Sequence, residues 1–173
     1  MPAPIRVPIT RPGHLGLRVE LKRLKSVDRP RIVQEISVAR DHGDLKENAE
    51  YHAAKEKQSF IEGRIQQVED LLSRAEVIDV RNLSGERVVF GATVKLREVE
   101  SEAAVVYRIV GEMEADMKKN RISVTSPIAR ALVGRSVGDF TTVRSPGGEK
   151  EFEILSVSFI EDPLPDAADL DDA

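Results

Sequence analysis

Hydrophobic side chains recur at steps of three and four residues through most of the first 75 positions, which places them on one face of an α-helix. Proline cannot donate a backbone hydrogen bond, and it disfavours helix at the residue before it. We therefore expect a kink or two abutting segments around "SVDRP", residues 26–30. The series comprises Leu17, Leu21 and Leu24, and after Pro30 it continues with Ile32 or Val33, Ile36 and Ala39.

A second helical series follows Gly43, a residue typical of a helix end. We expect this helix to begin at or near Asp44. Its alternating steps of four and three describe the narrow seam of a coiled coil. Because the connection is short, the two runs predict an antiparallel hairpin with arms on the order of 45 Å long, at 1.5 Å per residue. The apolar positions of the second arm are Phe60 or Ile61, Ile65, Val68, Leu72 and Ala75.

The pattern changes to alternating β-branched and polar residues beyond a boundary near residues 79–86, which is typical of strands. Ser126 as N-cap, Pro127 at the first helical position and Gly134 after the end predict one short helix between the third and fourth strands. The fold class is therefore α+β, with a mostly antiparallel sheet in the second half. The predicted strands are 87–97, 103–110, 121–125, 139–144 and 150–159.

Composition narrows the classes of function. The chain has no cysteine, which excludes disulfides, thiolate nucleophiles and cysteine-based zinc sites. No apolar run approaches the roughly 20 residues of a membrane span, and the N-terminus lacks the apolar core of a signal peptide. We therefore expect a cytoplasmic protein. Aromatic residues make up only 4%, too few for a nucleic-acid surface built on stacked rings.

The net charge of −4 comes from the C-terminal segment 161–173, which holds six acidic residues and no basic one. Without this segment, 24 acidic residues face 26 Lys and Arg, so the remainder is nearly balanced. The segment contains too few apolar residues to offset the entropy of ordering. We expect a disordered acidic tail, which either keeps the protein soluble or binds a partner.

The densest cluster of ionisable groups is "HGDLKENAEYH", residues 42–52, at the predicted hairpin tip. Asp44 and Glu47 have the spacing of a capping box, which would stabilise the start of a helix. Alternatively, two exposed carboxylates could help bind Mg²⁺ when other ligands come from outside the protein. A zinc site with His42 and His52 is a third option, although the usual i, i+4 histidine pair is missing.

Longer stretches resemble a known family. "RPRIVQEISVARDHGDLKENAEYHAAKEKQSFIEGRI" is similar, nearly position by position, to the hairpin of the bacterial Gre transcript cleavage factors. "VVFGATV", "YRIVG", "ISVTSPIARALVG" and "SPGGEKEFEI" resemble the C-terminal domain of the GreA type. The similarity covers roughly residues 8–160, and its most specific part is the tip string "GDLKENAEYHAA". The Pro- and Gly-rich N-terminus and the acidic tail depart from the family pattern.

The resemblance implies an N-terminal antiparallel coiled coil, residues 1–79, and a C-terminal FKBP-like domain that binds RNA polymerase, residues 80–160. It implies a factor that binds backtracked polymerase and inserts its hairpin through the secondary channel. There it would stimulate the polymerase to cut the extruded 3′ end of the nascent RNA. The protein would not itself be an enzyme, and we expect a monomer with no membrane partner.

The resemblance also assigns roles to residues. Asp44 and Glu47 fall on the family's two tip carboxylates, which would complete a Mg²⁺ site held jointly with the polymerase. Arg40 and Lys55 fall on a basic patch that contacts the extruded RNA, although each could be an ordinary solvated charge. Asn48 and Tyr51 would support the tip, and Tyr51 would either pack against the turn or contact RNA.

Other interpretations use the same features. An anti-cleavage relative would occupy the same channel and inhibit, but Asp44 and Glu47 are what cleavage-active members carry. An FKBP-like chaperone or prolyl isomerase would need clustered aromatic side chains, and a hairpin scaffold would have no chemistry. The aromatic residues of 80–160 are mostly at strand positions suited to a core: Phe90, Tyr107, Phe140, Phe152 and Phe159.

Overall fold

The computed structural model describes residues 3, 5–43 and 48–166, which fall into two compact units. The helical unit is built on Leu15–Arg74, and the sheet unit on Met1–His14 and Ala75–Pro163. The predicted α+β class is confirmed. The sequence had assigned residues 1–14 to the hairpin, whereas the structure groups them with the sheet. Within the described ranges, no helix is long and apolar enough to cross a membrane.

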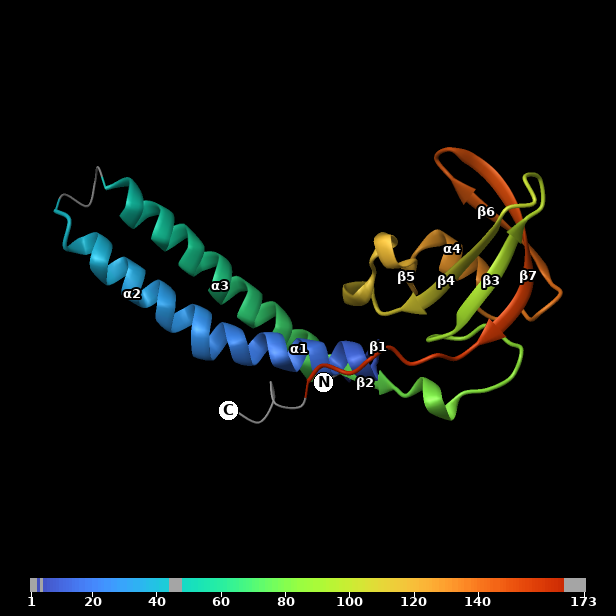
Figure 1. Cartoon of the computed structure of the whole chain (residues 1–173), viewed down its shortest axis with the longest axis horizontal. Coiled ribbons are helices and arrows are strands. Elements are labelled where there is room, and N and C mark those ends of the chain that lie inside the picture. The colour runs from blue at the N-terminus through green and yellow to red at the C-terminus, as the bar shows by residue number, and fades with distance from the viewer. Residues whose placement is uncertain (1–2, 4, 44–47, 167–173) are drawn as a thin grey trace. The chain divides into compact units, whose positions relative to one another are not determined.

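The helical unit is an antiparallel hairpin, as predicted (Figure 1). Its first arm runs from α1 (Arg11–Arg23) through the π-helical η1 (Leu24–Asp28) into α2 (Arg29–Arg40). Its second arm is α3 (Ala49–Arg74). The break expected around residues 26–30 is this π-helical stretch. Pro30 lies in the first turn of α2, where its missing N–H needs no partner within that helix.

The seam between the arms resolves the two choices that the periodicity left open. Ile32 is buried, whereas Val33 is 53% exposed; Ile61 is half-buried, whereas Phe60 is 81% exposed. Ala75, expected to continue the helical series, instead begins a strand. The buried seam residues are Leu17, Leu24, Ile32, Ile36 and Ala39 from the first arm and Ala54, Ile65 and Val68 from the second.

The sheet unit begins with a pair of short strands that the sequence did not predict. β1 (Val7–Thr10) and β2 (Ala75–Ile78) pair in parallel, with Val7 opposite Ala75. Each has only four residues, and β1 contains Pro8, which is tolerated because the pair has open edges. This pairing holds the start of the chain beside the linker that follows α3.

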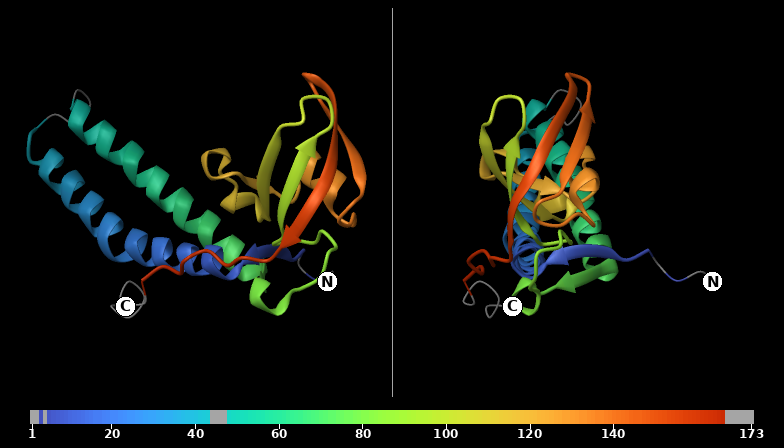
Figure 2. Two further views of the ribbon diagram at one scale, coloured as in Figure 1. Left: turned by 45° about the vertical axis from the view of Figure 1, so that its right-hand side comes forward. Right: turned by 90° about the vertical axis from the view of Figure 1, so that its right-hand side faces the viewer.

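The main sheet has five strands in the order β5-β4-β3-β7-β6. All neighbours are antiparallel except β4 and β5, which confirms a mostly antiparallel sheet. The β6–β7 hairpin is coloured orange to red in Figure 2. The strands are β3 (Thr93–Glu98), β4 (Ala104–Val110), β5 (Arg121–Ser123), β6 (Phe140–Ser145) and β7 (Gly148–Ser158).

The predicted strand 87–97 is shorter than expected. Arg87 forms only an isolated bridge with Ser136, and the chain turns at Gly91 before β3 begins at Thr93. Gly91 has a φ of +87°, and a Cβ there would meet Val80 Cγ1 at 2.6 Å. The predicted strand is therefore interrupted at Gly91, a position that accepts only glycine.

The short helix α4 (Pro127–Leu132) forms as predicted. Ser126 Oγ accepts a hydrogen bond from the Ala129 amide, and Gly134 has a φ of +89° just past the end. α4 packs on the core of the sheet through Ala129 and Leu132. Tyr107, Phe152 and Phe159 join this core instead of clustering around a pocket. Three 3₁₀ turns complete the unit: η2 (Val80–Asn82), η3 (Glu112–Glu114) and η4 (Met117–Lys119).

The first two residues of the expected disordered tail are bound to the sheet unit. Glu161 accepts hydrogen bonds from Arg11, one of them 3.1 Å long at Nε, and it lies 3.5 Å from Arg81 Nε. Asp162 pairs with Arg108 and, at 2.7 Å, with Arg121. The tail prediction is therefore wrong for Glu161 and Asp162, because four arginines from distant positions surround them.

Candidate functional site at the hairpin tip

The first arm of the hairpin ends in a glycine turn. The amides of His42 and Gly43 bond to the carbonyls of Ala39 and Arg40, at 3.3 and 3.4 Å. Gly43 has a φ of +108°, a conformation that L side chains rarely adopt. The sequence correctly marked Gly43 as the end of the first arm.

Asn48 joins the two arms through one side chain. Its Oδ1 accepts a hydrogen bond from the Tyr51 amide at 3.0 Å, which makes Asn48 the N-cap of α3. Its Nδ2 donates to the carbonyl of Ala39 in the last turn of α2 at 2.6 Å. Both ends of the connection between the helices are therefore fixed to each other.

The two carboxylates predicted to act in catalysis and metal binding, Asp44 and Glu47, lie outside the described residues. Their roles stay predictions. The predicted helix start is wrong for α3, which begins at Ala49. Because Asn48 accepts the bond from the third amide of α3, it takes the N-cap role that the spacing suggested for Asp44. Asparagine and aspartate are equally good caps, so spacing could not decide between them.

Tyr51 packs into the seam. It is half-buried against the cluster formed by Ile32, Ile36 and Ala54. The Arg40 guanidinium carbon lies 5.9 Å from the centre of its ring, within the range of a cation–π contact. Of the two roles considered for Tyr51, the packing contact is present.

Arg40 and Lys55 open onto the same groove, which we call the basic groove. It has a volume of about 340 Å³, and both helices contribute to it. Both basic side chains are exposed, and Lys55 Nζ donates to Gln58 Oε1 at 3.1 Å. Neither forms an ion pair with a residue that the structure describes. The remaining lining residues are Val33, Ile36, Ser37, Asp41 and Gln58.

The histidines considered for zinc are placed differently. His42 Nε2 lies 3.8 Å from a Glu50 carboxylate oxygen, and the His52 ring stands edge-on to Tyr51 at 5.6 Å. In the part of the chain that the structure describes, no three His, Asp or Glu side chains lie close enough together to hold a metal ion.

Comparison with known families decides the assignment. The family model for the N-terminal domain of transcription elongation factors matches residues 7–77, and the model for the GreA/GreB C-terminal domain matches residues 83–159. The chain belongs to the GreA/GreB family of transcription elongation factors. The family resemblance of the sequence is thereby confirmed.

Individual GreA proteins match most of the chain. The transcription elongation factor GreA of Anaeromyxobacter sp. (strain K) is 68% identical over 160 residues, covering 92% of this chain and 96% of that protein. GreA of Hyphomonas neptunium is 58% identical, covering 89% and 98%. Among solved structures, the GreA factor homolog 1 (Gfh1) protein of Thermus thermophilus is 28% identical, covers 88% and 98%, and has a TM-score of 0.41.

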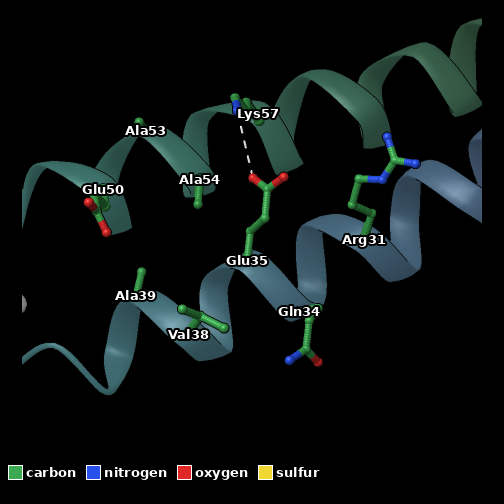
Figure 3. A pocket seen from close by; sticks show the side chains of 9 residues that line it. All are labelled: Arg31, Gln34, Glu35, Val38, Ala39, Glu50, Ala53, Ala54 and Lys57. Atoms are coloured by element: carbon green, nitrogen blue, oxygen red, sulfur yellow. Dashed lines mark ion pairs between the residues drawn. The ribbon is translucent and has the colours of Figure 1, made fainter.

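Sequence reasoning missed a second groove near the tip. It has a volume of about 540 Å³ and is lined from both helices, including Val38 of α2 and Ala53 of α3 (Figure 3). In the sequence, the only indication of this groove is Val38, a valine outside the seam pattern of the first arm, together with the small residues Ala53 and Ala54 of the second arm. We call it the alanine groove, since Ala39, Ala53 and Ala54 line it.

Proposed function

We propose that the protein binds RNA polymerase that has backtracked and stimulates the polymerase to cleave the extruded 3′ end of its RNA. The hairpin would enter through the secondary channel and bring its tip to the active centre. The observation that supports this most directly is the pair of hydrogen bonds that the Asn48 side chain makes, one to each arm. It fixes the two ends of the connection that carries Asp44 and Glu47, as a catalytic tip requires.

Asp44 and Glu47 would act as ligands and orienting groups. Carboxylate oxygens are what Mg²⁺ prefers, but two side chains supply only part of its octahedral shell. The ion would therefore be shared with the polymerase. When bound there, it would supply charge neutralisation at the phosphate and a more acidic water. Because this chain offers an incomplete site, the isolated protein should hydrolyse no RNA.

Arg40 and Lys55 would contact the RNA backbone. Both face the basic groove, and neither is neutralised by a described partner. Contacts to phosphate position a strand without reading its sequence. The basic groove would therefore hold the extruded RNA beside the carboxylates, whatever its sequence.

The sheet unit would be the main anchor on the polymerase, at the rim of the secondary channel. It exposes large apolar side chains, among them Met117 and Phe140. A slender hairpin buries much of its apolar surface in its own seam. We propose that the protein acts in the cytoplasm as a monomer, with one factor in each channel.

The deciding experiment uses stalled polymerase complexes with labelled RNA. Adding the protein with Mg²⁺ should accelerate shortening of the RNA from its 3′ end, whereas the protein without polymerase should leave RNA intact. Asp44→Ala or Glu47→Ala should abolish stimulation while preserving competition with the wild-type protein for polymerase. Nuclease activity without polymerase, or inhibition of cleavage by the wild-type protein, would contradict the proposal.

A further inference from the structure

The hairpin has two flanks, one on each side of the seam, and each flank carries ion pairs between the arms. The basic flank carries Arg40 and Lys55, together with two ion pairs between the arms. Arg29 donates to Glu62 at 2.8 and 2.9 Å, and Lys25 pairs with Glu69. The hydrogen bond from Arg29 lowers the pKa of Glu62, so this carboxylate is ionised at neutral pH.

The opposite flank, which we call the open flank, contains the alanine groove. Steps of three and four residues place Arg31, Gln34 and Val38 on one face of α2. The same spacing places Ala53, Lys57 and Phe60 on one face of α3. Its ion pair across the groove, between Lys57 and Glu35, is longer, at 3.6 Å. Further along the same flank, seven residues after Lys57, Arg64 binds Glu20 of the first arm at 2.8 Å, so charge pairing closes this flank beyond the groove.

Small side chains create the alanine groove. Alanine ends at Cβ, so Ala39, Ala53 and Ala54 leave a hollow between the two helices. Val38 borders it and is 46% exposed. In Figure 3, Glu50 and Arg31 lie at opposite ends of the groove, and Glu35 faces Lys57 between them. The hollow could receive one apolar side chain of moderate size.

Phe60 extends the apolar part of the open flank beyond the groove. It follows Lys57 by three residues and is the most exposed large hydrophobic residue among those the structure describes, at 81%. Aromatic side chains that become buried at the centre of an interface often contribute much of its binding energy. Phe60 and the groove together form a surface with two apolar contact points.

The charges around the groove favour protein over RNA. Glu35 and Glu50 balance the charges of Arg31 and Lys57 in its lining, so the groove offers a phosphate chain no net attraction. Glu50 is near His42, and Glu35 near Lys57, whereas Arg31 pairs with no described residue. The guanidinium of Arg31, at the end of the groove opposite Glu50, is therefore available to a partner. It is complementary to a carboxylate beside an apolar side chain.

We propose that the open flank docks on a protein segment of the RNA polymerase channel that presents an apolar side chain to the alanine groove and a carboxylate to Arg31. This inference rests on the proposed function. The hairpin then has two separate surfaces. Its basic flank contacts RNA, and its open flank contacts protein.

Site-specific photocrosslinking tests this assignment in stalled complexes with labelled RNA. A photoreactive amino acid is placed in the full-length protein at Val38 or Phe60, and as a matched control at Val33. Val33 is similarly exposed but lines the basic groove. We expect polymerase adducts from positions 38 and 60, and RNA adducts from position 33.

Three outcomes of crosslinking would overturn the docking surface. These are RNA adducts from positions 38 and 60, adducts between two copies of this chain, and equal polymerase adducts from position 33. The absence of adducts at 38 and 60, in complexes that still show stimulated cleavage, would overturn the docking surface alone. A wild-type protein that neither binds polymerase nor stimulates cleavage would overturn the proposed function as well.

Affinity measurements provide a second test. Phe60→Ala and Arg31→Glu should each weaken binding to polymerase roughly 5- to 30-fold, the range of important interface residues. The control Glu56→Ala, at an exposed position that lines neither groove, should change it less than about twofold. At saturating protein the maximal cleavage rate should be unchanged. All three residues are exposed, so the melting temperatures should agree, and unchanged affinity of both variants would contradict the proposal.

Discussion

In the sheet unit, Leu96, Ile109 and Leu132 are fully withdrawn from water in one continuous core, whereas the hairpin is held by a narrow seam of small clusters. The geometry of the hairpin tip depends on a few individual bonds, chiefly those of Asn48. We therefore expect the core of the sheet unit to determine stability and the hydrogen bonds of the tip to determine function. Changes in the sheet core should unfold the unit, whereas changes at the tip should alter its geometry with little loss of stability.

The largest expected effect is in the sheet core. Leu96→Ala should lower the free energy of unfolding by about 2–5 kcal/mol, since Leu96 is fully buried and the cavity can only partly collapse. Hydrogen exchange should show lost protection in β3 and β4 with unchanged protection in α2 and α3. The exposed neighbour Lys95→Ala is the control. Equal loss of protection in both units would mean that they unfold together and would contradict the comparison.

The next effect concerns Asn48. Asn48→Ala removes the cap and the link to Ala39, and should cost about 1 kcal/mol. Asn48→Asp keeps an acceptor for the Tyr51 amide but has no donor for the Ala39 carbonyl. If this donor bond positions the tip, the Asp variant should lose about as little stability as the Ala variant and keep its polymerase affinity, while its maximal cleavage rate falls roughly tenfold or more. A normal cleavage rate in the Asp variant would limit Asn48 to capping.

Much of the fold followed from local patterns. The steps of three and four predicted the hairpin, and Ser126 with Pro127 predicted α4. The family resemblance located the tip. What local patterns missed depends on partners distant in sequence. β1 has too few residues to show alternation, and its partner follows α3. Glu161 lies in a segment that has the composition of a disordered tail, and only the fold brings Arg11 and Arg81 close to it.

The tip shows the same limit on a smaller scale. Asp44 and Asn48 both suit an N-cap, and the choice depends on where the Ala39 carbonyl lies in space. Periodicity also left Phe60 and Ile61 as equal candidates for the seam. The structure buries Ile61 in part and exposes Phe60, which is how the open flank acquires its aromatic side chain.

A smaller effect is expected from acid on the ion pairs of the sheet unit. The hydrogen bond from Arg81, with a further contribution from Arg11, lowers the pKa of Asp79 from 3.8 to about 2. Arg11 likewise lowers the pKa of Glu161. A lowered carboxylate pKa adds stability that is complete above the unfolded value and is lost as pH falls towards the folded value.

The cluster of Arg11, Asp79, Arg81 and Glu161 should therefore persist at neutral pH and weaken between pH 4.5 and about 2. Thermal unfolding of Asp79→Asn, compared with the wild type across this range, should show a shallower dependence on pH. Because these ion pairs remain partly open to solvent, which screens them, the difference should be smaller than the effect of Leu96→Ala. Parallel pH profiles for both proteins would show that Asp79 contributes nothing to acid stability.

The smallest expected effect distinguishes the basic flank from the rest of the hairpin. If Arg40 and Lys55 contact RNA phosphates, each releases counterions when backtracked complexes bind. Arg40→Ala or Lys55→Ala should then leave unfolding nearly unchanged and reduce the salt dependence of binding, by about 0.7 in the slope of log K against log salt for each lost contact. The change should not depend on RNA sequence. Lys57→Ala on the open flank is the matched control, because Lys57 pairs with Glu35 and lies away from the basic groove. An equal change of slope for Lys57→Ala would mean that the charge of the whole hairpin, and not the basic groove, attracts the complex.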